Sequence, residues 1–155
     1  MVWVTPNYLF TDASCFVHRG RAGWAALVRR PDGSLLLELS GGEFCGQINR
    51  MELFAVIRGL AALPGPTSVE VYTDSKYVVT QAREWRDAYL RRKWRLAGLV
   101  KANEDLWLEF VELCGVHQVS VRWVRGHSGH PDNERVDTLA RKAAIGMLKQ
   151  VRKTP

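Results

Sequence analysis

With 155 residues, 46% of them hydrophobic and 25% charged, the chain has the length and composition of one folded domain, which we expect to span residues 1–155. These proportions exclude a disordered or fibrous protein, and no apolar run approaches the roughly 20 residues of a membrane-spanning helix. The formal net charge of +6 favours a polyanionic partner, and residues 83–101 carry seven basic but only two acidic side chains.

The three cysteines, Cys15, Cys45 and Cys114, include no Cys-x-x-Cys pair. An odd count without such a pair argues against a disulfide framework and against a structural zinc site. The first residues lack a basic segment followed by an apolar one, so we expect no signal peptide. We therefore expect reduced thiols and a cytoplasmic protein without a membrane partner.

Three strands are predicted before the first helix. Residues 8–11 form an apolar segment that ends at Asp12, and residues 23–30 form a second one. A turn is expected at 31–34, because its proline presets φ and its glycine accepts positive φ. The chain then returns as a strand over 35–39, so these strands are expected to form an antiparallel meander.

The first helix is predicted to begin at Asn49 and to end before the Pro-Gly-Pro segment at 64–66. Asn49 is the expected N-cap, and Glu52, three residues later, would complete a capping box. Apolar residues at positions 53, 54, 56, 57, 60 and 61 follow a helical period.

The rest of the chain alternates strands and helices. Residues 68–73 are predicted to form a strand, and a helix follows from Lys76 to about residue 85. Another helix is expected to begin at Asn103 or Glu104, followed by a strand over 116–124, a polar loop and a last helix. Strands separated by helices favour parallel additions to the meander, which together make a mixed α/β sheet with helices packed on it.

Four carboxylates lie at boundaries of these predicted elements. Asp12 and Asp74 follow strands, whereas Glu52 and Asp137 lie near the starts of helices. The carboxyl ends of adjacent parallel strands lie at one edge of a sheet, so Asp12 and Asp74 could meet there. Four carboxylates converge only around a cation, and oxygen ligands favour a hard ion such as magnesium.

Each carboxylate also has an ordinary structural explanation. A capping box with Asn49 would by itself explain Glu52, and a helix cap would explain Asp74. An ion pair with Arg141 would explain Asp137, and a turn would explain Asp12. Taken one at a time, these explanations are the more common ones, because acidic residues gather at helix starts.

The sequence segments around the four carboxylates favour a shared metal site over these separate structural roles. They are Thr11-Asp12-Ala13-Ser14, Asn49-Arg50-Met51-Glu52-Leu53, Thr73-Asp74-Ser75-Lys76-Tyr77-Val78, and the segment from Gly126 to Asp137. In this order they closely resemble the type 1 ribonuclease H family over about residues 8–144. The resemblance implies an α/β ribonuclease H-like fold, with a five-stranded mixed sheet, helices on both faces and a basic protrusion at about 83–101.

The resemblance also implies a reaction, the endonucleolytic hydrolysis of the RNA strand of RNA–DNA hybrids by two-metal-ion catalysis, which leaves 5′-phosphate and 3′-hydroxyl ends. The family's metal-binding carboxylates match Asp12, Glu52, Asp74 and Asp137. They would hold two Mg²⁺ ions, with Mn²⁺ as the alternative metal. The family's mobile catalytic histidine matches His127, whereas His130 is expected to be satisfied by local hydrogen bonds rather than to bind zinc.

The hybrid-binding surface implied by the resemblance combines contacts to RNA 2′-hydroxyls in the minor groove with a basic surface for the DNA strand. The expected substrate-binding residues are Ala13, Ser14, Cys15, Asn49, Thr73, Lys76, Trp85, Arg91, Arg92, Lys93, Trp94 and Asn103. Among them, Trp85 is expected to stack on the DNA sugar-phosphate backbone, and Thr73 and Asn103 to contact DNA phosphate. We expect the protein to act as a monomer.

Four positions depart from the residues that are common in the family: Ala13, His18, Ile48 and Lys76. These departures should affect the affinity for the hybrid and the sequence preference, not the reaction.

Three other functions fit parts of the pattern. A non-catalytic nucleic-acid-binding module would need an incomplete carboxylate set, whereas all four carboxylates match. The ribonuclease H part of a reverse transcriptase polyprotein stays open. An integrase or resolvase that cuts DNA is disfavoured by the segment from His127 to Asp137 and by the basic protrusion. The basic tail, residues 149–155, is expected to fray.

Overall fold

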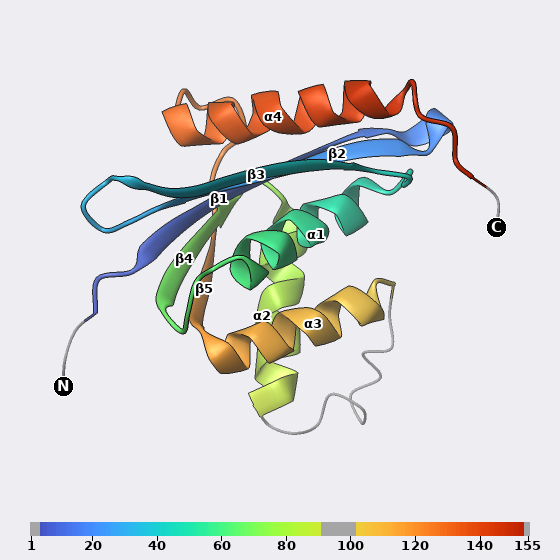
Figure 1. Ribbon diagram of the computed structural model, residues 1–155. Helices are drawn as coiled ribbons and strands as arrows, with labels where there is room; N and C mark the ends of the chain where they lie inside the picture. The colour runs from blue at the N-terminus through green and yellow to red at the C-terminus, as the bar shows by residue number, and fades with distance from the viewer. Residues whose placement is uncertain (1–3, 91–101, 154–155) are drawn as a thin grey trace.

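Five strands in the order β3-β2-β1-β4-β5 form the sheet of the computed structural model, which describes residues 4–90 and 102–153 (Figure 1). The strands are β1 (Asn7–Phe16), β2 (Arg21–Arg29), β3 (Leu35–Glu43), β4 (Ser68–Thr73) and β5 (Gln118–Trp123). The first three pair antiparallel, and β1 pairs parallel with β4, which in turn pairs parallel with β5. The predicted mixed sheet is thus confirmed.

Helices cover both faces of this sheet, as predicted. Helices α1 (Ile48–Ala61), α2 (Lys76–Leu90) and α3 (Glu104–Val116) lie on one face, and α4 (Pro131–Met147) lies alone on the other (Figure 1). A short 3-10 helix, Val17–Arg19, joins β1 to β2. Within the described residues, no helix is both long and apolar enough to cross a membrane.

The core is divided by the sheet, because successive side chains of a strand point to opposite faces. On β1, Leu9 belongs to the large cluster shared with α1, α2 and α3, whereas its neighbour Phe10 belongs to the smaller cluster shared with α4. Helix α4 contributes the buried Val136 and Ala140 to that smaller cluster, and its partly buried Leu139 packs against it. The alternation therefore also places Asp12 on the α4 face, two residues after Phe10.

Two strands are longer than predicted. Strand β1 continues through Asp12 to Phe16, because β2 pairs with it over that whole length, and the expectation that Asp12 follows the strand is wrong. Strand β3 continues through Gly41, beside the Trp24 ring: a Cβ at Gly41 would lie 2.8 Å from that indole. Polar and glycine residues that suggest turns are thus held in the sheet by their partner strands.

The predicted cap of α1 is also wrong. The N-cap residue is Gln47, no side chain makes a capping hydrogen bond, and Asn49 lies inside the helix, where it is exposed. Glu52 is buried, and its Oε2 atom has no hydrogen-bond partner in the described part of the chain. Its carboxylate therefore does not serve a capping box.

Candidate active site

The register of the central strands brings two of the four predicted carboxylates together. Strands β1 and β4 pair in parallel as far as Phe10 and Tyr72. Asp12 and Asp74 each follow two residues later, so they lie beside each other where β4 ends and β1 continues. Carboxylate atoms of Asp12, Glu52 and Asp74 lie within 4.8 Å of one another.

Helix α4 and the loop before it complete the site. Asp137 and His127 line one small cavity with Asp12 and Asp74, together with Thr11, Gly126, Asn133 and Glu134. A side chain at Gly126 would begin 2.9 Å from an oxygen of Asp74, so a residue without Cβ lets the loop approach this carboxylate. His127 has a φ of 56°, a left-handed conformation that is uncommon for residues other than glycine.

The electrostatics of the site favour a bound cation. Burial, and then the charge of Asp74, raise the pKa of Asp12 to about 8. Burial, and then the charges of Asp12 and Asp74, also raise the pKa of Glu52 well above its usual range. Burial raises the pKa of Asp74 as well, and His127 only partly offsets this shift. The site therefore disfavours its own negative charge, which a cation would neutralise.

The donor set fits a hard divalent cation such as magnesium. Three carboxylates converge, and the buried Oε2 of Glu52 lacks a partner in residues 4–90 and 102–153, so it is free for an ion. Asp137 lies at the same cavity but outside this group of three, and its Oδ2 accepts a hydrogen bond from Arg141 at 2.7 Å. Asp137 therefore both pairs with Arg141 and lines the cavity.

His130 is satisfied locally, as predicted. Its Nδ1 accepts a hydrogen bond from the backbone N–H of Asp132 at 3.3 Å, which caps α4. Its ring also stacks on Phe10, with the ring centroids 4.9 Å apart. These contacts leave His127 as the histidine that lines the cavity.

The remaining predicted substrate-binding residues have different surroundings. On β1, the N–H of Ala13 donates to Oδ1 of Asp12 at 2.9 Å, and Ser14 and Cys15 are partly exposed. Lys76 is exposed, and its Nζ lies 5.3 Å from the centre of the Trp123 ring. The Nδ2 of Asn103 donates to the Tyr77 hydroxyl at 3.0 Å.

Two substrate-binding predictions are wrong. Trp85 is 1% exposed and stacks on Trp107 in the core, with the ring planes 8° apart, so it cannot stack on a nucleic acid. Thr73 is fully buried, and its hydroxyl accepts the N–H of Ser75 at 3.1 Å, so it cannot contact a phosphate. Arg91, Arg92, Lys93 and Trp94 lie outside the described residues.

Trp123 lies beside the site, although no sequence pattern singled it out. This side chain is 46% exposed, and its indole N–H donates to the backbone oxygen of Asp74 at 3.2 Å, so it holds the end of β4 beside the site. Asn133 and Glu134, which line the cavity, were also not singled out. Their positions within the segment that ends at Asp137 were the one available signal.

Removing one carboxylate should stabilise the metal-free protein. Because folding raises the pKa of Asp12 to about 8, its contribution to stability is present below about pH 4 and is lost as the pH rises towards 8. We expect Asp12→Asn to raise the free energy of unfolding at pH 8 by more than about 1.4 kcal/mol, the equivalent of one pKa unit, with little change at pH 4. Urea unfolding in EDTA at both pH values measures this difference.

Asp32 is the matched control for this measurement. The Ser34 hydroxyl and N–H lower the pKa of Asp32, so Asp32→Asn should not stabilise the protein at pH 8. If Asp12→Asn instead unfolds at lower urea than the parent at pH 8, the carboxylates do not repel one another as their geometry indicates.

Comparison with known sequences identifies many relatives. The RNase H family model matches residues 5–145. A ribonuclease H of Thiobacillus denitrificans is 44% identical over 139 residues, which cover 89% of this chain and 93% of that protein. A ribonuclease H of Thermus thermophilus is 46% identical over 143 residues, covering 91% of this chain and 85% of that protein.

Solved structures give the same result. The crystal structure of LC9-RNase H1, described as a type 1 RNase H with the type 2 active-site motif, superposes with a TM-score of 0.73 at 30% identity, covering 94% of this chain and 75% of that chain. The N-terminal RNase H domain of rv2228c from Mycobacterium tuberculosis shares the fold, with a TM-score of 0.74 at 24% identity, covering 94% of this chain and 97% of that chain.

Proposed function

We infer the reaction from one premise: the chain belongs to the ribonuclease H family and is a ribonuclease H enzyme. We propose that it acts as a monomer in the cytoplasm and hydrolyses the RNA strand of RNA–DNA hybrids endonucleolytically, leaving 5′-phosphate and 3′-hydroxyl ends. The observation that carries this proposal is the convergence of Asp12, Glu52 and Asp74 at the end of β4.

The proposed catalytic residues are Asp12, Glu52, Asp74, His127 and Asp137. Asp12, Glu52, Asp74 and Asp137 would hold two Mg²⁺ ions, with Mn²⁺ as the alternative, and Asp12 would be shared between them. When bound, such ions supply an activated water and stabilise the leaving oxygen of an in-line displacement. The four carboxylates would hold the ions in position. His127, at the cavity wall, would transfer protons to or from the reacting groups.

The proposed hybrid-binding residues come from several elements of the chain. Ala13, Ser14 and Cys15 continue along β1 from Asp12, and Asn49 is exposed near the start of α1. These residues are proposed for contacts to RNA 2′-hydroxyls, and their partial exposure supports this. Lys76 and Asn103 remain candidates for the DNA strand, and the basic residues Arg91, Arg92 and Lys93, with Trp94, are proposed for it from sequence alone.

A cleavage assay on four labelled substrates tests the function. The protein is incubated with Mg²⁺ and RNA–DNA hybrid, double-stranded RNA, double-stranded DNA or single-stranded RNA. We expect cutting of the RNA strand of the hybrid alone. Cleavage of DNA would indicate an integrase- or resolvase-like nuclease, and binding without cleavage would indicate a non-catalytic module.

We expect His127→Ala to slow turnover by roughly 100-fold or less, the lower range for a positioned proton-transfer group. Single-turnover cleavage of the hybrid measures the effect. His130→Asn is the comparison, because Asn can keep the capping hydrogen bond but loses the ring that stacks on Phe10, so turnover should fall less than in His127→Ala. Complete loss of activity in His127→Ala would contradict a role limited to proton transfer.

Changing Arg91, Arg92 and Lys93 together to Ala should weaken hybrid binding mainly at moderate salt. Each lost phosphate contact should reduce the slope of log affinity against log salt by about 1, and kcat should change little. Binding titrations at several salt concentrations measure this slope. An unchanged slope and KM would show that these three residues do not contact phosphate.

A further inference from the structure

The apolar contacts of α4 with the sheet hold its middle and end more closely than its beginning. The buried residues of the helix are Val136, Ala140 and Ala144, with Leu139 partly buried beside them. Gly23 of β2 packs against the backbone of Ala140 and Ala144, and Arg21 donates to the backbone oxygen of Met147, whereas none of the first five residues of the helix, 131–135, is buried. Yet this helix supplies Asp137 to the site.

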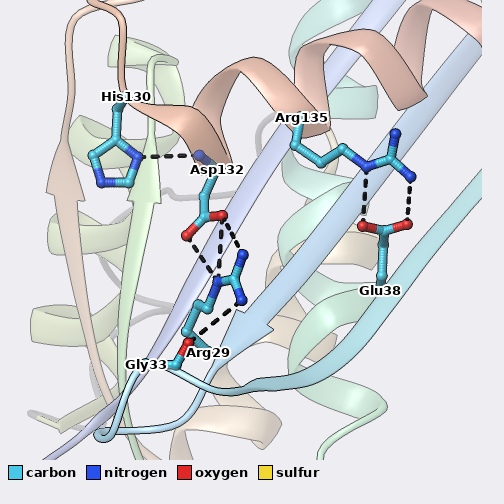
Figure 2. A network of polar contacts seen from close by, with 6 residues as sticks. All are labelled: Arg29, Gly33, Glu38, His130, Asp132 and Arg135. Atoms are coloured by element: carbon cyan, nitrogen blue, oxygen red, sulfur yellow. Dashed lines mark hydrogen bonds and ion pairs between the residues drawn. The ribbon is translucent and has the colours of Figure 1, made fainter.

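Two charged forks fix the beginning of α4 (Figure 2). Arg29, on the α4 face of β2, donates to Asp132 from Nη2 to Oδ1 at 2.9 Å and from Nε to Oδ2 at 3.1 Å. One turn later, Arg135 donates to Glu38 of β3 at 2.9 and 3.1 Å. Bidentate Arg–carboxylate pairs are directional, so they can set the position of these first turns, where the helix buries no side chain before Val136.

The Arg29–Asp132 pair is the less exposed of these two forks. Its side chains are 34% and 13% exposed, and Arg29 also donates to the backbone oxygen of Gly33 in the β2–β3 turn at 3.4 Å. The N–H of Asp132 donates to His130, whose ring stacks on Phe10, two residues before Asp12. The first turn of α4 is therefore tied to both β2 and β1.

We propose that Arg29 is a positioning residue for metal binding, acting through Asp132 to hold the first turns of α4 so that Asp137 faces Asp12. This inference rests on the proposed function. Asn133, Glu134 and Asp137, which line the site, all follow Asp132 within two turns of the helix. Without the fork, the helix would keep its apolar contacts, but Asp137 would occupy a range of positions.

The test compares Arg29→Met and Asp132→Asn with the parent protein in two Mg²⁺ titrations. One titration follows hybrid cleavage, and the other follows the rise in melting temperature that Mg²⁺ causes by binding the folded state. We expect both midpoints to move about 10-fold higher in each variant, as for other residues that orient metal ligands, with an unchanged KM for the hybrid. Arg29→Lys should fall between, because an ammonium cannot form the fork.

Arg122→Met is the matched control. It removes an ion pair between Arg122 and Glu70, which lies on β5 and β4 rather than on α4, and it should leave both midpoints unchanged. Unchanged midpoints in Arg29→Met, whatever its melting temperature, would overturn the proposal, and so would a change confined to KM. If Arg29→Met does not fold, the two Mg²⁺ midpoints of Asp132→Asn, which removes only a charge, test the proposal in its place. A parent protein that neither binds Mg²⁺ nor cleaves the hybrid would refute the proposed function instead.

Discussion

Asp12→Asn should abolish cleavage in Mg²⁺, while hybrid binding in Ca²⁺ persists. Asp12 belongs, with Glu52 and Asp74, to the group of carboxylates whose oxygens lie within 4.8 Å of one another, and it is the proposed shared ligand of both ions. Asparagine keeps the shape of the side chain but removes the charge that a divalent cation requires. Cleavage and binding are measured on the same labelled hybrid, so that loss of turnover is separated from loss of affinity.

Asp32→Asn is again the control, because Asp32 lies in the exposed β2–β3 turn, away from the site. It should cleave like the parent protein. Parent-like turnover of Asp12→Asn in Mg²⁺ would remove Asp12 from the catalytic group and with it the proposed sharing of two ions.

Gly23→Ala should destabilise the protein by about 3 kcal/mol, the upper end for overpacking. A methyl group at Gly23 would overlap the backbone oxygen of Ala140 and the backbone nitrogen of Ala144, so β2 and α4 would have to separate. Backbone atoms cannot move aside as a flexible side chain can. Urea unfolding measures the loss of stability, and because α4 carries Asp137, cleavage should also fall in the molecules that remain folded.

Gly146→Ala offers a matched comparison at the end of the same helix. No atom lies within 4 Å of a Cβ built there, and Ala favours helices over Gly, so this variant should be as stable as the parent or slightly more stable. Equal stabilities for Gly23→Ala and Gly146→Ala would show that α4 does not pack on β2 as closely as the structure has it.

Local patterns in the sequence predicted the order of strands and helices and placed Asp74 after β4, but they placed Asp12 after a strand that in fact continues through it. They could not predict the length of β1. The next three residues after Asp12, Ala13 to Cys15, are small, and pairing with β2 as far as Phe16 and Arg21 keeps them extended. The same limit applies to Gly41 in β3, which the Trp24 ring covers.

The errors in the predicted site have a similar origin. Trp85 lies among arginines in the sequence, which favours a surface position, but its partner Trp107 comes from α3, a contact that no local pattern encodes. Asn49 is a good capping residue, yet the N-cap is Gln47, two residues earlier, and the helix begins at Ile48. Local sequence periodicity cannot predict the burial or the hydrogen bonding of a side chain whose partner lies on a distant element.

The pairing of β1 with β4 also restricts how the length of this chain can vary among its relatives. One residue inserted between Asn7 and Asp12 would leave Thr11 at the site and turn Asp12 towards α1, since side chains alternate between faces. Two inserted residues would restore the face but carry Asp12 about 7 Å beyond Asp74. Substitutions in β1 can therefore accumulate, whereas insertions and deletions should be found in places such as the exposed β2–β3 turn, where no catalytic side chain depends on the count.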